Sequence, residues 1–326
     1  MGKRNKRGTV VGSDYEVLFA DGASDAGAPG PGWIRTKTIK AGEMLNVESC
    51  PVIVNPDLRR RCETEKKRLR TSPAQERVNE EHSRKRFTAL LETNFGLGDV
   101  LVTNTYDYGV FDYGMNSMKD VQQYRSTDEL PESFEDANRD KNNFIKRVKN
   151  AITRLGGKAK DLKYMWVIEA GKEPNDLDPN PTPRKYHMHI VMSHPLIKAR
   201  IITREMLENI WGFGFTRCES LKYDNNGLAR LGKYMTKQRR YNRRWGRSRN
   251  LKEPVITVSS YKMSMRRSER IAADVRANAA EIYAKLYPGY VLAEQPIIKY
   301  SKFIGGAYIY ARLRKIKKAA CKLLWN

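Results

Sequence analysis

From residue 99 onward, the hydrophobic positions follow two periods, one typical of strands and one typical of helices. Residues 99–106 and 164–169 are rich in β-branched and aromatic side chains and predict two strands. Between them, apolar residues recur at helical spacing and two glycines end the pattern. These residues are Phe144, Ile145, Val148, Ile152 and Leu155, followed by Gly156 and Gly157. A loop rich in Pro and Asp at 172–183 leads to a third strand at 186–193.

The residues beyond the third strand complete this pattern. Thr203 can cap a short helix that runs through Trp211, residues 213–221 are a plausible fourth strand, and residues 227–240 are expected to form a helix. The order is β-α-β-β-α-β with one more helix, and consecutive strands of this kind pair antiparallel. We therefore predict an α+β fold with a ferredoxin-like β-α-β-β-α-β core, an antiparallel sheet and an additional helix.

Both ends of the chain lie outside this core pattern. Strand-like pieces at 33–39 and 44–54 precede a charged segment at 57–91, in which Pro73 is expected to start a helix. A basic tail at 310–322 is interpreted as a helix with one packed face and one DNA-binding face. The predicted parts are an accessory region of strands and helices at 1–95, a core domain at 96–255 and a basic helical extension at 256–326.

The charge balance of the chain favours a polyanionic partner. Lys and Arg number 61 against 37 Asp and Glu, which gives a formal net charge of +24 on 326 residues. Nucleic acid is the first candidate for such a partner. Hydrophobic residues make up 40% of the chain, enough for a core, but no apolar run reaches the roughly 18 residues of a membrane span. We expect a soluble protein that makes no membrane contact.

The cysteines and the first residues predict a cytoplasmic location. Residues 1–8 are basic and lack the apolar stretch of a signal peptide. The cysteines are too scattered for a paired zinc site and are interpreted as reduced thiols. They are Cys50, Cys62, Cys218 and Cys321.

Candidate chemistry lies in the third predicted strand. Side chains alternate across a strand, so His187 and His189 lie on one face, close enough to hold one metal ion, while Met188 and Ile190 lie on the other. An apolar strand carries two polar residues on one face when something there satisfies them, and a divalent metal is a common partner of paired imidazoles. A hydrogen-bonded histidine pair without a ligand is the alternative. These residues alone leave both interpretations open.

A carboxylate is expected beside the two histidines. Glu169 ends the strand that forms a hairpin with the histidine strand, so it can lie within coordination reach of His187 and His189. Two imidazoles and one carboxylate leave open positions on a metal for water or substrate, which suits catalysis. The alternative for Glu169 is an exposed residue at a strand end. His194, at an odd offset from His189, and His82, in a polar helix, are not expected to be ligands.

Three blocks of residues together resemble the HUH endonucleases, named for histidine, hydrophobe, histidine. The resemblance covers roughly residues 95–255 and is closest to the rolling-circle replication initiators (Rep proteins) of phages, plasmids and mobile elements. The blocks are Val100 to Tyr106, then His187-Met188-His189 with upstream Glu169, then Tyr234-Met235-Thr236-Lys237, in the family's order.

The resemblance implies site-specific nicking of single-stranded DNA and strand transfer through a 5′-phosphotyrosine. Glu169, His187 and His189 would hold a divalent metal, Mg²⁺ or Mn²⁺, and Tyr234 would be the nucleophile. Lys237 lies one helical turn from Tyr234 and can approach the phenolic oxygen or the phosphate. Tyr241, two turns beyond Tyr234, is the reserve nucleophile.

A free 3′-hydroxyl left by the nick would prime DNA synthesis, which implies several partners. These are single-stranded DNA or an origin stem-loop, a DNA polymerase and a separate helicase. The helicase is expected to be separate because the chain has no Gly-x-x-x-x-Gly-Lys-Ser/Thr phosphate loop. The expected setting is the cytoplasm of a bacterial cell or of a phage-infected host.

A basic stretch surrounds and follows the candidate nucleophile. Residues 231–252 contain nine Lys and Arg and no acid, interrupted by aromatic residues that offer flat surfaces to unpaired bases. The predicted DNA-binding residues are Lys233, Arg239, Arg240, Arg243, Arg244, Trp245, Arg247 and Arg249.

Other protein classes share parts of this pattern. A non-haem iron oxygenase also uses two histidines and a carboxylate, but it has no use for the high positive charge or the Tyr-Lys helix. A nucleic-acid-binding module with a structural metal, or none, would have the charge without the chemistry. Relaxases and transposases share the tyrosine chemistry, so sequence separates them poorly from replication initiators.

Overall fold

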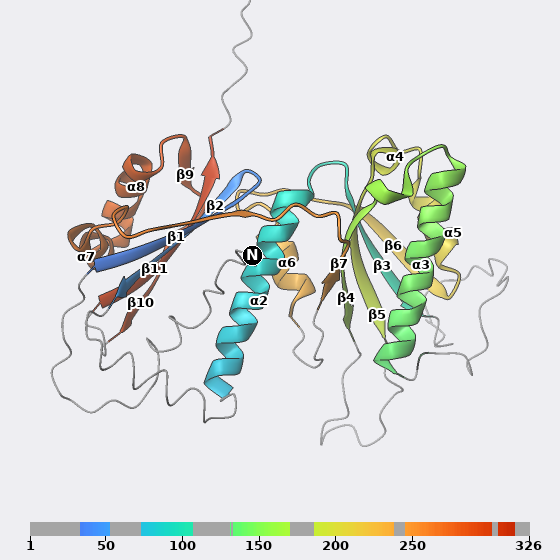
Figure 1. Ribbon diagram of the computed structural model, residues 1–326, viewed down its shortest axis with the longest axis horizontal. Coiled ribbons are helices and arrows are strands. Elements are labelled where there is room, and N and C mark those ends of the chain that lie inside the picture. The colour runs from blue at the N-terminus through green and yellow to red at the C-terminus, as the bar shows by residue number, and fades with distance from the viewer. Residues whose placement is uncertain are drawn as a thin grey trace, which may run out of the picture. The chain divides into compact units, whose positions relative to one another are not determined.

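The computed structural model describes residues 33–52, 73–106, 131, 133–169, 186–237, 245–301 and 306–316, and the chain forms two compact units (Figure 1). Unit 1 combines Met1–Ala89, Asn225–Gly227 and Pro254–Asn326. Unit 2 combines Leu90–Asp224 and Leu228–Glu253. Among the described helices, none has the length and apolar character needed to cross a membrane.

Unit 2 is built on a five-stranded antiparallel sheet in the order β6-β3-β5-β4-β7. The strands are β3 (Val100–Tyr106), β4 (Lys163–Glu169), β5 (His187–Ser193), β6 (Gly214–Ser220) and β7 (Gly246–Arg247). The helices of this unit are α3 (Phe134–Arg154), η3 (Ala159–Asp161), α4 (Pro195–Lys198), α5 (Arg204–Trp211) and α6 (Ala229–Met235). The order β3-α3-β4-β5-α5-β6 confirms the predicted α+β, ferredoxin-like arrangement.

The core of unit 2 lies between α3, α5 and one face of the sheet (Figure 1). Met188 and Ile190 of β5 are buried there against Phe144 and Val148 of α3 and Trp211 of α5. Because side chains alternate along β5, the same pattern turns His187 and His189 to the opposite face. Burial of the apolar face therefore fixes the register that brings the two histidines together.

The helix boundaries of unit 2 follow recognisable capping signals. Ser133 caps α3 by accepting a hydrogen bond from the backbone N–H of Asp136 at 3.1 Å, and Thr203 caps α5 in the same way through Met206. Gly156, with φ of 76°, lies just after α3, where a left-handed conformation ends the helix. Helix α6 ends at Met235, earlier than predicted, with Thr236 as its C-cap, and residues 238–240 of the helix predicted at 227–240 lie outside the described residues.

Unit 1 contains a second antiparallel sheet, in which strands from the two ends of the chain pair. Its order is β10-β11-β2-β1-β8, and β9 also pairs with β11. The strands are β1 (Trp33–Ala41), β2 (Met44–Val52), β8 (Val255–Ser259), β9 (Tyr290–Leu292), β10 (Ile297–Ser301) and β11 (Gly306–Lys315). The helices are α7 (Met265–Ala273) and α8 (Val275–Leu286), together with α2 (Pro73–Asn94), which contributes its residues through Ala89 to this unit.

One face of the unit 1 sheet packs against α7 and α8. Val47 lies opposite Ala311, and both are buried with Ile282 and Tyr283 of α8. Regions 1–95 and 256–326, which were expected to be separate parts, thus contribute strands to one sheet. The expected strands near residues 33 and 44 and the helix starting at Pro73 are confirmed.

The predicted basic helix at 310–322 is wrong over its described residues, because Gly306–Lys315 is β11, an interior strand of the sheet. Ile309, Ala311 and Leu313 are fully buried on the apolar face, while Tyr310 and Arg312 alternate with them. This period of two is typical of a strand, and the interpretation as a helix gave weight to the basic residues instead. Residues 317–322 lie outside the described residues.

Candidate metal centre

The face of the unit 2 sheet that lies opposite the α3 and α5 core brings together the three side chains predicted to hold a metal. In the hairpin of β4 and β5, Glu169 lies directly opposite His187, and Val167 lies opposite His189. Residues two apart on one strand share a face, so Glu169 and the two histidines project to the same side. One hydrophobic pattern thus supplies both the core on one face and the polar cluster on the other.

The potential ligand atoms of this cluster are close to one another. The Nε2 atom of His187 lies 3.0 Å from Oε2 of Glu169, and the Nε2 atom of His189 lies 3.9 Å from the same oxygen. One ligand atom from each residue lies within 4.8 Å of the others. This spacing allows two imidazole nitrogens and one carboxylate oxygen to bind a single ion.

Burial leaves two atoms of the cluster unsatisfied. Glu169 is 0% exposed and His189 is 1% exposed. Among the described residues, Oε1 of Glu169 and Nε2 of His189 are buried without a hydrogen-bond partner. A buried polar atom without a partner costs about 1–3 kcal/mol. Because a cation would satisfy both atoms, the donor set fits a divalent metal.

The protonation states also suit metal binding. Burial lowers the pKa of His189 to about 4, and the neighbouring His187 and Lys237 act in the same direction. Burial opposes ionisation of Glu169, but the hydrogen bond from His187 and the charges of His189, His187 and Lys237 hold its pKa below the ordinary value. At neutral pH the site therefore presents a neutral imidazole and an ionised carboxylate, which are the forms that bind metals.

Helix α6 brings Tyr234 and Lys237 to the same face of the sheet. The ring of Tyr234 packs edge-on to His189 with 5.0 Å between ring centroids, and 44% of the Tyr234 surface is exposed. Just beyond the helix, Nζ of Lys237 lies 3.5 Å from Oε2 of Glu169 and 4.6 Å from the Tyr234 ring centroid. The phenol is thus accessible beside the metal cluster, with an ammonium group next to both.

The start of α6 is anchored within unit 2. The buried carboxylate of Glu92 accepts a hydrogen bond from the backbone N–H of Leu228, one residue before the helix begins. Arg230, in the first turn, pairs with Asp224 at 3.1 Å. Met235, next to Tyr234, is fully buried. These contacts fix the helix so that Tyr234 lies over the face of the sheet that carries the metal cluster.

The remaining sequence-predicted residues lie in several places. Lys233 and Arg249 are exposed, Trp245 and Arg247 are half-buried, and Arg247 pairs with Glu253. The other predicted residues lie outside the described residues; they are Arg239, Arg240, Tyr241, Arg243 and Arg244.

The other two described histidines lie apart from the cluster. His194 caps α4, where Nδ1 accepts a hydrogen bond from the backbone N–H of Leu196 and Nε2 lies 3.2 Å from the carbonyl oxygen of Lys158. Both ring nitrogens of His194 are thereby occupied. His82 lies in the unit 1 part of α2.

One residue of the site was not identified from the sequence. Thr103 of β3 lies opposite His189 in the sheet, and its hydroxyl is 3.0 Å from Nδ1 of that histidine. Thr103 lies within the first motif block, Val100 to Tyr106, but the sequence alone assigns it no role. Its place beside His189 becomes evident only from the pairing of β3 with β5.

Comparison with known proteins supports a role in DNA replication. Residues 99–239 match the model of the replication-associated protein ORF2/G2P family. The matched segment runs from the start of β3 past Lys237, so it includes the metal cluster and Tyr234. No curated protein and no solved structure showed a significant match to the chain. The match covers less than half of the chain, and within that segment the chain is similar to replication-associated proteins and carries the Glu169, His187 and His189 cluster.

Proposed function

We propose that the protein is an HUH endonuclease that initiates rolling-circle DNA replication by nicking single-stranded DNA and transferring the strand. The observation that carries this proposal is the convergence of Tyr234 and Lys237 on the face of the sheet that holds Glu169 and the two histidines. The match of this same segment to a replication-associated family supports replication over conjugative transfer or transposition, which use similar chemistry.

In the proposed reaction, the phenolic oxygen of Tyr234 attacks the scissile phosphorus and the bond from phosphorus to the 3′ oxygen breaks. The phenol proton ends on the 3′ oxygen, so the products are a 5′-phosphotyrosine and a free 3′-hydroxyl. One ester replaces another, so the step needs no ATP and can be reversed to rejoin ends. A divalent ion, Mg²⁺ or Mn²⁺, held by Glu169, His187 and His189 would withdraw charge from the phosphate.

The protein side chains have separate tasks in this scheme. Exposure of Tyr234 gives its hydroxyl access to a phosphate. The ammonium group of Lys237, over the Tyr234 ring, can stabilise the negative charge that develops on the phenolic oxygen. The ion pair between Lys237 and Glu169 also holds this ammonium group next to the three candidate metal ligands.

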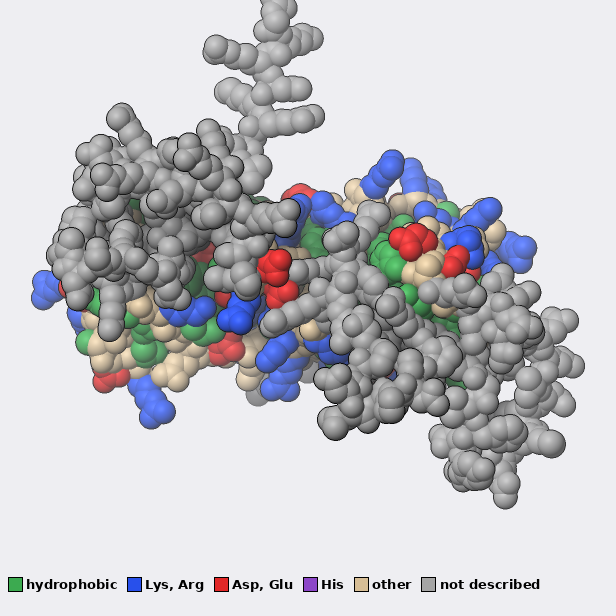
Figure 2. All heavy atoms as spheres, turned by 90° about the horizontal axis from the view of Figure 1, so that it is seen from below, with side chains coloured by type: hydrophobic (Ala, Val, Ile, Leu, Met, Phe, Trp, Pro, Cys, Tyr) green, Lys and Arg blue, Asp and Glu red, His purple; other side chains and the backbone are tan. Residues whose placement is uncertain are grey.

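Positive charge near the site supports single-stranded DNA as the substrate. The chain carries a net charge of +24, and Lys and Arg side chains occur at several places among the described residues on the face seen in Figure 2. In the described part of the basic stretch, Lys233 and Arg249 are exposed and Trp245 is partly exposed. Cations for phosphates and a flat ring for a base are the elements of a single-strand site.

The direct test is a covalent adduct between the protein and DNA. Full-length protein is incubated with Mn²⁺ and a pool of single-stranded oligonucleotides that carry randomised loops on stable stems. We expect an adduct that survives SDS, and mass spectrometry should find DNA on the peptide that contains Tyr234. Tyr234→Phe should lose the adduct and keep DNA affinity, because only the nucleophilic hydroxyl is removed.

Tyr261→Phe is the matched control, since Tyr261 is 94% exposed in unit 1 and should form the adduct at the wild-type level. Absence of any adduct from the wild-type protein in Mn²⁺ or Mg²⁺ would favour a non-catalytic nucleic-acid-binding protein. An adduct on a different tyrosine would reject Tyr234 as the nucleophile.

A further inference from the structure

The first motif block has no role in the reaction proposed above, yet one of its residues contacts a predicted metal ligand. Thr103 and His189 are direct partners in the pairing of β3 with β5. The hydroxyl oxygen of Thr103 lies 3.0 Å from Nδ1 of His189, on the side of the ring away from Nε2. His189 is 1% exposed, so water has little access to this ring.

We propose that Thr103 is a positioning residue that orients His189 and accepts its Nδ1–H when Nε2 binds the metal. A neutral imidazole has one N–H and one lone pair, so a ring that binds metal through Nε2 must carry its proton on Nδ1. Metal-binding histidines commonly donate this second N–H to an acceptor, which fixes the ring and its tautomer. This inference rests on the proposed metal site and concerns metal binding rather than cleavage.

The structure explains why this contact matters more for the metal-bound form. A hydroxyl can donate or accept, so in the metal-free protein His189 can carry its proton on either nitrogen. With the proton on Nε2, the ring faces the Glu169 carboxylate, whose Oε2 is 3.9 Å away. When Nε2 binds a metal, only the tautomer with the proton on Nδ1 is allowed. The Nδ1–H then requires a hydrogen-bond acceptor. Loss of the Thr103 hydroxyl should therefore weaken metal binding more than it weakens folding.

The two histidines differ in their need for such a partner. The side chain of His187 is 28% exposed, so water can reach it, and its Nε2 lies 3.0 Å from Glu169. His189 is enclosed between strands and its described Nδ1 contact is with Thr103. Of the two candidate ligands, His189 is the one that depends on a protein hydroxyl for its orientation.

The test measures binding of Mn²⁺ alone by calorimetry, in the full chain without DNA. Thr103→Val keeps the shape of the side chain and removes the hydroxyl, and we expect about 10- to 100-fold weaker Mn²⁺ binding. Thr103→Ser restores the hydroxyl and should bind Mn²⁺ within about threefold of wild type, because the acceptor is retained. Thr105→Val is the matched control, since Thr105 lies two residues along the same strand, opposite His187.

A second measurement separates positioning from folding. The ¹⁵N chemical shifts of the His189 ring in the metal-loaded protein (Zn²⁺ in place of the paramagnetic Mn²⁺) should show a protonated Nδ1 in wild type and in Thr103→Ser. The melting temperature of the metal-free Thr103→Val protein should stay close to that of Thr105→Val. A merely structural threonine would instead lower the melting temperature of Thr103→Val well below that of Thr105→Val and leave the Mn²⁺ affinity unchanged.

Several results would overturn the inference. These are wild-type Mn²⁺ affinity in Thr103→Val, equal loss in Thr103→Ser, or no Mn²⁺ binding by the wild-type protein. Failure of the proposed function has a different signature, because a protein that binds Mn²⁺ through Thr103-oriented His189 but forms no DNA adduct would reject the nickase and leave this inference standing.

Discussion

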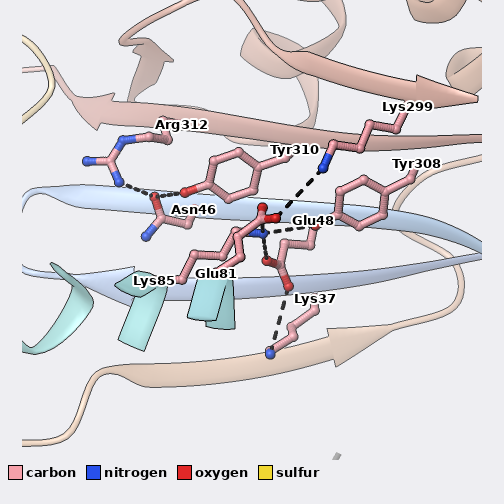
Figure 3. A network of polar contacts seen from close by, with 9 residues as sticks. All are labelled: Lys37, Asn46, Glu48, Glu81, Lys85, Lys299, Tyr308, Tyr310 and Arg312. Carbon is pink, nitrogen blue, oxygen red and sulfur yellow. Dashed lines mark hydrogen bonds and ion pairs between the residues drawn. The ribbon is translucent and has the colours of Figure 1, made fainter. Parts of the chain in front are cut away.

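Each of the two units buries a carboxylate on the sheet face opposite its main hydrophobic core, and the two carboxylates have different surroundings. In unit 1, Glu48 is 5% exposed and both of its oxygens face ammonium groups, Lys85 at 2.9 Å and Lys37 at 3.8 Å (Figure 3). In unit 2, Glu169 is 0% exposed and one of its oxygens has no hydrogen-bond partner among the described residues. Burial alone therefore does not distinguish a structural carboxylate from a metal ligand; what distinguishes Glu169 is an unsatisfied oxygen in a carboxylate that lies beside two imidazoles.

The surroundings of Glu48 are those of a structural network. Lys85 also lies 3.2 Å from the hydroxyl of Tyr308 and 4.4 Å from the ring centroid of Tyr310. Burial would lower the pKa of Lys85, but the carboxylate of Glu48 and the hydroxyl of Tyr308 raise it above its ordinary value, so the ammonium stays charged. Figure 3 shows the same face continuing to Asn46, whose side-chain oxygen accepts from Arg312 at 3.0 Å. These groups satisfy one another and link strands to α2 within unit 1.

Removal of charge from Glu169 should have the largest effect. Glu169→Gln keeps the size of the side chain but replaces a carboxylate ligand with an amide, so we expect Mn²⁺ affinity to fall by more than about 100-fold. Adduct formation with DNA should be lost together with the metal. The measurements are calorimetry with Mn²⁺ and the SDS-resistant adduct assay.

Glu48→Gln is the matched control for this substitution, since it makes the same change at the carboxylate of unit 1. Its Mn²⁺ affinity should equal that of wild type. Loss of Mn²⁺ binding in Glu48→Gln, or retention in Glu169→Gln, would remove the distinction between the two carboxylates.

The same two variants should rank in the opposite order when the free energy of unfolding is measured, with the larger loss in Glu48→Gln. Glu48→Gln leaves the ammonium of Lys85 partly buried without its main counter-charge, which costs about 3–5 kcal/mol in comparable buried pairs. Glu169→Gln should cost the metal-free protein much less, because Glu169 already has an unsatisfied oxygen and its ammonium partner Lys237 is half exposed, so water can solvate that charge. Urea unfolding of both variants in EDTA gives the comparison. A smaller loss in Glu48→Gln than in Glu169→Gln would contradict it.

Local patterns were sufficient to predict most of unit 2. The alternation around His187 and His189 and the helical spacing of Phe144 and Val148 report directly on which face is buried, and that face determines the order and register of the elements. The approach of Glu169 to the histidines also followed, because it needs only one hairpin. Contacts of this kind depend on neighbouring segments of the chain.

Contacts between distant segments could not be predicted in the same way. The pairing of Thr103 with His189 and of Glu48 with Lys85 depends on which strands and helices become neighbours, and no local pattern contains that information. The misassigned strand β11 has a related cause, since its partner β2 lies more than two hundred residues earlier in the chain. The roles of Arg239, Arg240, Tyr241, Arg243 and Arg244 stay predictions.

The smallest expected effect is a pH dependence that belongs to the unit 2 site. In the metal-free protein, burial lowers the pKa of His189 to about 4, with Glu169 opposing this shift and His187 and Lys237 adding to it. Above pH 6.5 the ring is neutral in both the folded and unfolded chain, so it adds no pH dependence. As pH falls from 6.5 towards 4, the unfolded chain binds a proton that the folded chain resists, and stability falls by up to about 3 kcal/mol.

A variant that cannot be protonated at position 189 isolates the contribution of His189 to the pH dependence of stability. His189→Asn keeps a polar side chain that cannot titrate, so its free energy of unfolding in EDTA should fall less than that of wild type between pH 7.5 and 5. The comparison cancels His82 of unit 1, whose pKa is also lowered by burial but which both proteins share. Lys85 stays charged throughout this range, so the Glu48 network adds no lysine titration. Equal pH dependence in the two proteins would mean that the surroundings of His189 do not hold it neutral. The Glu169 site would then no longer differ from the Glu48 network by a histidine whose protonation destabilises the fold.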